Sequence, residues 1–191
     1  MALDAGTLAQ LTEAVSKFVD ERLIPLEAQV AAEDKIPDTV IAEMAELGLF
    51  GLTIPAKYGG LGLNTEEECR IVMELGRAAP AFRSVIGTNN GIGSQGLVLH
   101  GTNAQRGYYL PKLASGEITG SFALTEPDAG SDSAAISLRA IADGDDFLLS
   151  GTKRYITNAT RAQLFTVFAR TNPDERGSRG ISAIHVDAST P

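Results

Sequence analysis

The residue types that offer chemistry are concentrated between Phe122 and Asp132, in the run Phe-Ala-Leu-Thr-Glu-Pro-Asp-Ala-Gly-Ser-Asp. This run leaves an expected short strand, turns at Pro127 and ends in small residues. Small residues let backbone amides come close to a bound molecule, and a hydroxyl group can donate to an anion or a carbonyl oxygen. The run is therefore typical of a ligand-binding turn.

A second run, Tyr-Ile-Thr-Asn at residues 155–158, closes another expected strand. Tyr155 and Thr157 are two residues apart, which on a strand puts both side chains on one face. An aromatic ring beside a hydroxyl group suits a flat heteroaromatic ring with polar edges. The two runs together predict a site for a ligand of that kind.

Carboxylate and hydroxyl side chains in the first run allow other interpretations. Glu126 and Asp132 could form a carboxylate pair for acid–base or glycosidic chemistry. A proline and a glycine lie between them, which is more typical of side chains that cap turns and accept backbone N–H bonds. Ser131 needs a positioned base to act as a nucleophile, and nothing in the sequence pairs it with His100 or His185. We therefore assign no catalytic residue.

Residues 91–96 read Gly-Ile-Gly-Ser-Gln-Gly and match the glycine pattern of a dinucleotide-binding loop, with Glu117 at the distance of its acidic residue. That loop requires a strand before it and a long helix after it. The expected neighbours here are helices, and Gly101 follows soon after. We therefore interpret the run as small residues that let two helices approach closely, in preference to an NAD-binding loop.

The elements that must position these residues fall into two parts with different periodicity. Apolar residues recur three or four apart up to about residue 116, and shorter β-type runs follow. Helices are expected from residue 8 with a break or kink at Pro25, and over 37–48, 65–79, 81–100 and 102–114, with capping boxes at Thr65/Glu68 and Thr102/Gln105. Strands are expected over 121–124, 136–142, 147–156, 164–169 and 181–186.

This order predicts a segregated α+β fold and not an alternating one. We expect an N-terminal all-helical domain over residues 1–116, followed by an antiparallel β domain over residues 117–191. The last expected strand stops five residues before Pro191. So small a sheet is expected to be incomplete and barrel-like.

Composition limits the class of protein. Of 191 residues, 43% are hydrophobic and 21% are charged, which is ordinary for a soluble globular protein. No apolar run is long enough to cross a bilayer, and the first ten residues lack a basic secretion signal, so a cytoplasmic location is expected. The net charge of −8 argues against a nucleic-acid partner. One cysteine and two histidines exclude an internal disulfide and a closed zinc site, so we assign no metal ligand.

Residues 124–132 followed by residues 150–158 (Ser-Gly-Thr-Lys-Arg-Tyr-Ile-Thr-Asn) resemble the flavin-binding signature of the acyl-CoA dehydrogenases. Residues 54–62 (Ile-Pro-Ala-Lys-Tyr-Gly-Gly-Leu-Gly), 101–105 and 109–117 support the resemblance in the order and spacing of that family. The resemblance covers essentially the whole chain. It implies an N-terminal helical domain and most of a middle β domain, without the C-terminal helical bundle of the family.

The resemblance also implies FAD as the cofactor and an acyl-CoA thioester as the substrate. Phe122 and Leu124 would contact FAD through backbone and packing, and Thr125 would bind the pyrimidine side of the flavin. Ser131 would meet the pyrophosphate of FAD or the pantetheine arm of the substrate. Tyr155 would lie against the flavin ring, and Thr157 would donate near N5. The implied cofactor-binding residues are Phe122, Leu124, Thr125, Gly130, Ser131, Tyr155, Ile156 and Thr157, with Ser131 also binding substrate.

Two positions depart from the family pattern, which commonly has Trp where Tyr155 stands and often Tyr where Phe122 stands. The glutamate that serves the family as general base belongs to its C-terminal region, so we expect residues 1–191 alone to be inactive. Electrons would pass to an electron-transfer flavoprotein or a similar acceptor. A homo-oligomer, dimer or tetramer, acting in fatty acid metabolism is expected. The alternative is a catalytically silent subunit that binds FAD or CoA.

Overall fold

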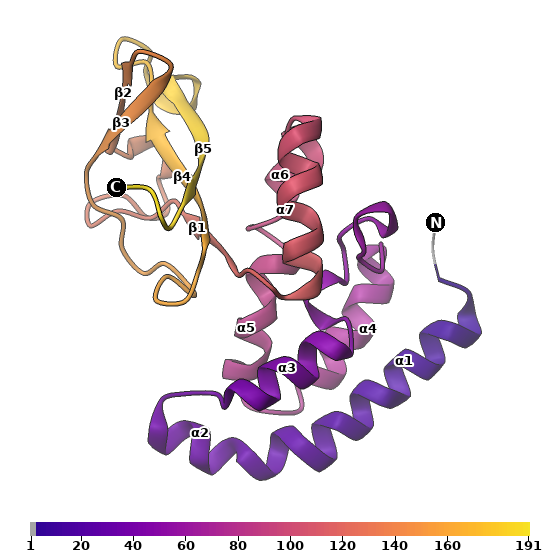
Figure 1. The fold of residues 1–191 in the computed structure, drawn as a ribbon. Helices are drawn as coiled ribbons and strands as arrows, with labels where there is room; N and C mark the ends of the chain where they lie inside the picture. The colour runs from indigo at the N-terminus through magenta and orange to yellow at the C-terminus, as the bar shows by residue number, and fades with distance from the viewer. Residues whose placement is uncertain (1–2) are drawn as a thin grey trace. The chain divides into compact units, whose positions relative to one another are not determined.

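The computed structural model describes residues 3–191, which divide into two compact units with the boundary between Ile118 and Thr119. We call them the helical unit and the sheet unit and describe each by itself (Figure 1). Helices come first in the chain and a sheet follows, which confirms the predicted fold class. The domain boundary between residues 116 and 117 stays a prediction, because compactness alone does not test whether either part folds independently.

The helical unit is built from helices and short helical turns. Its described α-helices are α1 (Ala5–Phe18), α2 (Glu27–Glu33), α3 (Asp38–Glu46), α4 (Thr65–Leu75), α5 (Pro80–Asn90), α6 (Gln95–His100) and α7 (Asn103–Ser115). Fully buried side chains from several of these helices and from the turns Val19–Leu23 and Leu49–Gly51 form its core: Val15, Leu23, Met44, Phe50, Leu75 and Phe82. Each such side chain contributes roughly 1.5–3 kcal/mol by leaving water.

The chain between α1 and α2 stays helical but changes its hydrogen-bond pattern. A π-helical turn over Val19–Leu23 and a 3-10 turn over Ile24–Leu26 join the two helices (Figure 1). Pro25 has no amide hydrogen for an α-helical bond, so the turn around it must rearrange. This confirms the predicted break or kink.

Capping residues set where two helices begin. At α7, the Thr102 hydroxyl accepts the amide of Gln105 at 3.2 Å and the Gln105 side chain accepts the amide of Thr102 at 2.8 Å, as predicted. At α4 the predicted capping box was wrong by one residue. Asn64 caps the helix together with Glu67, because a side-chain amide oxygen fills the same role as a hydroxyl.

The first four residues of the glycine-rich run, 91–94, separate α5 from α6, so the predicted single helix over 81–100 is two helices. Gly91 lies at φ −115° and ψ −116°, a conformation that glycine adopts readily. The amide of Gly93 donates to the Thr88 carbonyl across this break at 2.8 Å. A helix and not a strand precedes the run, which argues against a dinucleotide-binding loop.

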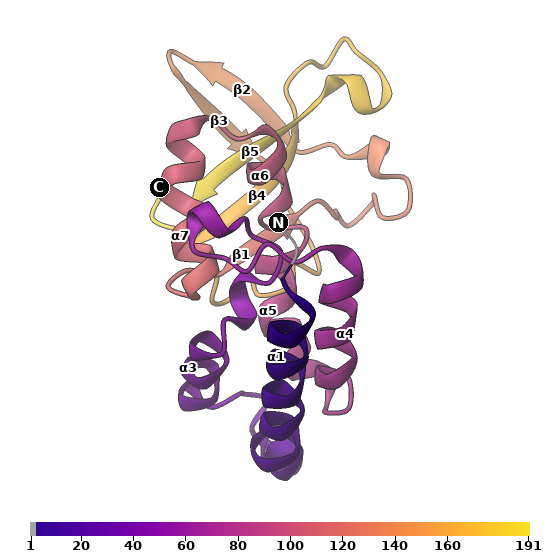
Figure 2. The ribbon, with the colours of Figure 1, turned by 90° about the vertical axis from the view of Figure 1, so that its right-hand side faces the viewer.

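The sheet unit contains one open sheet of five strands among its described residues: β1 (Gly120–Ala123), β2 (Arg139–Asp143), β3 (Asp146–Ser150), β4 (Leu164–Arg170) and β5 (Ile181–Asp187). β4 is central, since β5 pairs antiparallel along its whole length. β1 pairs parallel with β4 over Gly120–Ala123, and β2 meets β4 only at Arg139 and Arg170. In Figure 2 the β2–β3 hairpin projects away from the β4–β5 pair.

The prediction that all strands of the sheet are antiparallel was wrong, because the sheet is mixed. Strands joined by short turns pair antiparallel, as β2 does with β3. β1 and β4 are separated by residues 124–163, and a connection of that length allows the chain to return to the same end and pair in parallel.

The predicted strand over 147–156 was also too long, since β3 ends at Ser150. Its partner β2 begins at Arg139, and the preceding residue, Leu138, already accepts the amide of Arg170 through its carbonyl at 2.7 Å. A Cβ at Gly151 would lie 2.9 Å from Leu138 Cα, so the chain turns away closely there. Residues 151–158 therefore lie outside the sheet.

Candidate functional site

The first candidate segment, residues 124–132, leaves β1 and folds into a tight turn. Glu126 and Ala129 exchange backbone hydrogen bonds of 2.9 and 3.3 Å across Pro127 and Asp128. Proline suits the second position of such a turn, which explains why the chain reverses here. Gly130 and Ser131, beyond the turn, are exposed.

The second candidate segment, residues 151–158, is irregular. Tyr155 has φ +58° and Asn158 has φ +62°, both in the left-handed region. That region is uncommon for residues with a side chain, and for a bulky aromatic residue it costs energy that the surroundings must offset. The expectation that Tyr155 and Thr157 share one face of a strand was wrong, because no strand reaches them.

Direct hydrogen bonds nevertheless join the two segments. The amide of Arg154 donates to the Thr125 carbonyl at 2.8 Å, and the Lys153 ammonium donates to the Leu124 carbonyl at 2.9 Å. At the far end, the buried Ser121 hydroxyl donates to the Thr157 carbonyl at 2.6 Å. The chain that follows β1 therefore lies beside the chain that precedes β4. We call the place where residues 124–126 lie beside residues 153–157 the junction.

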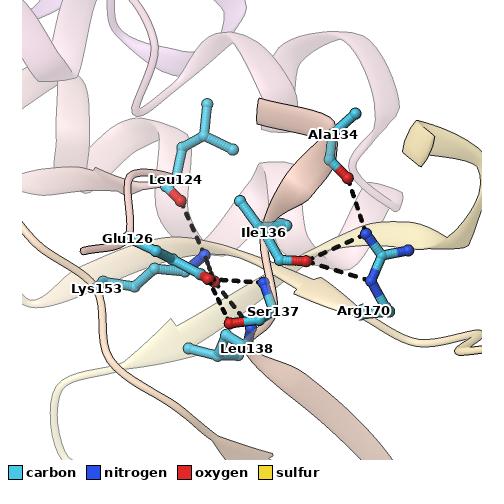
Figure 3. A network of polar contacts seen from close by, with 8 residues as sticks. All are labelled: Leu124, Glu126, Ala134, Ile136, Ser137, Leu138, Lys153 and Arg170. Atoms are coloured by element: carbon cyan, nitrogen blue, oxygen red, sulfur yellow. Dashed lines mark hydrogen bonds and ion pairs between the residues drawn. The ribbon is translucent and has the colours of Figure 1, made fainter. Parts of the chain in front are cut away.

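A buried carboxylate lies at the centre of this junction (Figure 3). The Glu126 side chain is 4% exposed and forms an ion pair of 2.9 Å with Lys153, whose side chain is 9% exposed. The carboxylate also accepts the amides of Ser137 and Leu138 at 2.6 and 2.9 Å and the Ser137 hydroxyl at 2.8 Å. Glu126 therefore accepts backbone N–H bonds as expected, but these amides belong to Ser137 and Leu138 and not to the turn at Pro127, so the turn-capping part of the interpretation was wrong.

Asp132 also accepts a backbone amide, that of Ala134, at 3.2 Å. It caps a 3-10 turn over Ser133–Ala135. Since Glu126 and Asp132 bind separate backbone groups, they do not act as a paired acid and base.

Glu126 ionises at unusually low pH. Burial alone would raise its pKa, but the amides of Ser137 and Leu138, the Lys153 ammonium and the Ser137 hydroxyl lower the pKa to about 2. Hydrogen bonds to the charged form of a carboxylate favour that form. Glu126 is therefore ionised throughout the physiological range.

This low pKa predicts a specific loss of stability in acid. Because the folded pKa lies below the usual 4.5, the contribution of Glu126 is complete above about pH 4.5 and is lost as the pH falls toward about 2. The full contribution is about 3 kcal/mol. Urea unfolding of the wild type and of Glu126→Gln at several pH values should show the two stabilities converging as the pH falls. A constant difference between them would contradict this assignment.

The structure brings some of the predicted site residues together and places the others elsewhere. Leu124 and Thr125 lie directly against the segment that carries Tyr155, Ile156 and Thr157. Phe122 lies on β1 with its ring 4.8 Å from that of Phe168. Among the described residues, no hydrogen bond links Gly130 or Ser131 to the second segment. The junction thus brings together five of the predicted residues, Leu124, Thr125, Tyr155, Ile156 and Thr157.

The groups available at the junction fit a flat ring with polar edges. The Tyr155 side chain is 78% exposed, and the Arg154 guanidinium lies 4.5 Å from its ring centre. Thr157 is exposed and Thr125 is half-buried. Within residues 3–191 the hydroxyls of Thr125 and Thr157 have no hydrogen-bond partner, so they remain available to a ligand. The same holds for the Ser131 hydroxyl, which lies outside the junction. These groups are of the kind that an isoalloxazine and a pyrophosphate require.

Sequence reasoning missed the structural roles of Lys153 and Arg170, because most basic residues are solvated. The Arg170 guanidinium donates to the Ala134 and Ile136 carbonyls at 2.9 to 3.2 Å (Figure 3). It also donates to the Glu175 and Gly177 carbonyls. A basic residue that directly follows a run of apolar strand residues is the signal that would have identified Arg170.

Comparison with known proteins gives matches along nearly the whole chain. The family model for the acyl-CoA dehydrogenase N-terminal domain matches residues 7–117, and that for the acyl-CoA dehydrogenase middle domain matches residues 121–191. The (2S)-methylsuccinyl-CoA dehydrogenase of Cereibacter sphaeroides is 37% identical over 176 residues, which make up 92% of this chain and 32% of that protein.

Solved structures give the same result. An acyl-CoA dehydrogenase from Geobacillus kaustophilus has a TM-score of 0.89 at 32% identity, over 97% of this chain and 49% of its own. An acyl-CoA dehydrogenase from Bacillus anthracis, complexed with FAD, has a TM-score of 0.85 at 30% identity, over 97% of this chain and 31% of its own. The chain spans less than half the length of these relatives.

Proposed function

Because the chain belongs to the acyl-CoA dehydrogenase family, we propose that it forms the FAD-binding part of an enzyme that desaturates an acyl-CoA thioester at its α and β carbons. The observation that carries the proposal is the junction at which Lys153 and Arg154 bind the carbonyls of Leu124 and Thr125. When bound, FAD would accept a hydride from the substrate, chemistry that no amino-acid side chain supplies.

Each residue at the junction has a proposed task. Thr125 would bind the polar edge of the flavin, and Tyr155 would cover one face of the ring. Thr157 would donate its hydroxyl near N5, where charge develops during reduction. Phe122, Leu124 and Ile156 would support FAD through packing and backbone groups.

Gly130 and Ser131 have a separate proposed task outside the junction. Gly130 would let the backbone come close to the pyrophosphate, because a Cβ there would meet no atom within 4 Å. Ser131 would donate its hydroxyl to that pyrophosphate or to the pantetheine arm of the substrate.

The general base is proposed to lie outside residues 3–191. A general base works best when its pKa is near the working pH, and Glu126, with a pKa of about 2, is far too acidic for that task. Its oxygens are also occupied by Lys153, Ser137 and Leu138. We therefore propose that Glu126 stabilises the fold and does not remove the α-proton.

The wider setting is part of the same proposal. We propose an acyl-CoA of fatty acid metabolism as substrate, an electron-transferring flavoprotein or a similar acceptor as partner, and a cytoplasmic homo-oligomer, such as a homotetramer, as the working form. No described helix is long and apolar enough to span a membrane.

The test is to titrate the protein with FAD and then to assay the complex with a panel of acyl-CoA thioesters and an artificial electron acceptor. We expect residues 1–191 alone to bind FAD poorly and to give no turnover, because the base is not among them. Addition of the family's C-terminal region should restore both. Turnover by residues 1–191 alone would show that one of their own carboxylates acts as base. FAD binding without turnover in the longer protein would favour the silent-subunit alternative.

A further inference from the structure

The Glu126–Lys153 pair is buried at a point where neither side chain is needed for the proposed chemistry. Burying two opposite charges gives little net stability, because the loss of hydration nearly offsets their attraction. Neutral side chains of similar size would stabilise the fold about as well. The value of the pair must therefore come from the geometry that it imposes.

That geometry concerns three consecutive residues of the first segment. The Lys153 ammonium binds both the Leu124 carbonyl and the Glu126 carboxylate, each at 2.9 Å. Between them, the Thr125 carbonyl accepts the amide of Arg154 at 2.8 Å. Lys153 thus binds residues 124 and 126, Arg154 binds the residue between them, and these bonds set the relative position of the two segments.

The same carboxylate also bonds to another part of the sheet unit. The amides of Ser137 and Leu138, just before β2, donate to the two Glu126 oxygens. Three stretches of chain therefore meet at one ion pair (Figure 3).

The residue that follows Lys153 and Arg154 has a strained backbone. Tyr155 has φ +58° directly after Arg154, and its ring is 78% exposed. A bulky residue keeps a disfavoured backbone only where its neighbours leave no alternative. The bonds of Lys153 and Arg154 supply that constraint on one side, and the Ser121 bond to the Thr157 carbonyl supplies it on the other.

We propose that Glu126 and Lys153 are positioning residues for the flavin: their ion pair holds the Leu124–Glu126 turn against residues 153–157, so that Thr125, Tyr155 and Thr157 present one preformed surface. This inference deepens the proposed function and rests on it.

The main test is the double variant Glu126→Gln/Lys153→Met, prepared in the longer protein that includes the family's C-terminal region and loaded with FAD. It leaves no buried charge, and the introduced side-chain amide keeps one oxygen for the amide of Ser137 or Leu138. Because the other amide loses its acceptor, the thermal midpoint should fall below that of the wild type while the protein still folds. The bond to the Leu124 carbonyl is lost. We therefore expect the Kd for FAD to rise at least about tenfold and the absorbance bands of the bound flavin to shift, because a displacement of about 1 Å spoils a preorganised site.

The matched control is Glu66→Gln/Arg70→Met, which removes an exposed ion pair on α4. It should leave the Kd for FAD and the flavin spectrum unchanged. A Glu126→Gln/Lys153→Met protein with the Kd and flavin spectrum of the wild type would overturn the inference. A wild type of that longer protein that binds no FAD would instead overturn the proposed function.

A second measurement needs neither FAD nor a variant. In the wild-type apoprotein the Arg154 amide should exchange with deuterium about a hundredfold more slowly than the exposed amide of Thr152. Equal exchange rates would show that the junction is not preformed and would overturn the inference. This measurement stays decisive if the double variant does not fold.

Discussion

Replacing Lys153 with methionine is expected to lower the free energy of unfolding of the sheet unit by about 3–5 kcal/mol, because the change leaves the Glu126 carboxylate buried without its counter-charge. The carboxylate keeps its bonds to Ser137 and Leu138 but cannot reach water. Urea unfolding near neutral pH, followed by a signal from the sheet unit, measures the loss.

Arg70→Met provides the matched control for this change. It also removes the cation of an ion pair, but the side chains of Arg70 and Glu66 are 58% and 75% exposed. Exposed pairs contribute about 0–1 kcal/mol, so its effect should be small. If Lys153→Met costs no more than Arg70→Met, the Glu126–Lys153 pair has no special role in the fold.

In the longer protein that includes the family's C-terminal region, replacing Thr157 with alanine is expected to slow reduction of bound flavin by the substrate about 10–100-fold, with a smaller change in KM. The hydroxyl is available near the proposed N5 position, and a donor matters most where charge develops in the transition state. Stopped-flow absorbance at the flavin bands separates the reduction rate from substrate binding.

Thr160→Ala is the control for Thr157→Ala, since Thr160 lies in the same turn, is exposed and has no proposed contact with FAD. Its reduction rate should match that of the wild type. A Thr157→Ala protein with normal reduction and only a raised KM would place this hydroxyl in ground-state binding instead.

Local signals in the sequence were sufficient for much of the fold. The helix-to-sheet division near residue 116, the capping of α7 by Thr102 and the kink before Pro25 all follow from residues close together in the chain. The turn at Pro127 is local in the same sense, whereas the carboxylate of Glu126 bonds to residues further along the chain. Such local features depend on intrinsic preferences that a short window of sequence displays.

The features that sequence reasoning missed depend on distant partners. The end of β3 at Ser150 is decided by Leu138, which is already bonded to Arg170 on β4. In the sequence, Lys153 has the features of an ordinary solvated basic residue, because its partner Glu126 lies far back in the chain. Tertiary contacts of this kind override local preference, and one sequence read by itself does not display them.

The parallel pairing of β1 with β4 determines when the site can form during folding. The β2–β3 and β4–β5 pairs join strands that are close in sequence, so they can form early at little cost in chain entropy. The β1–β4 ladder requires closure of the whole loop over residues 124–163. Both segments proposed to bind the flavin lie within that loop. We therefore expect closure of the loop and assembly of the cofactor site to be one late step, at which bound FAD would act as a folding template.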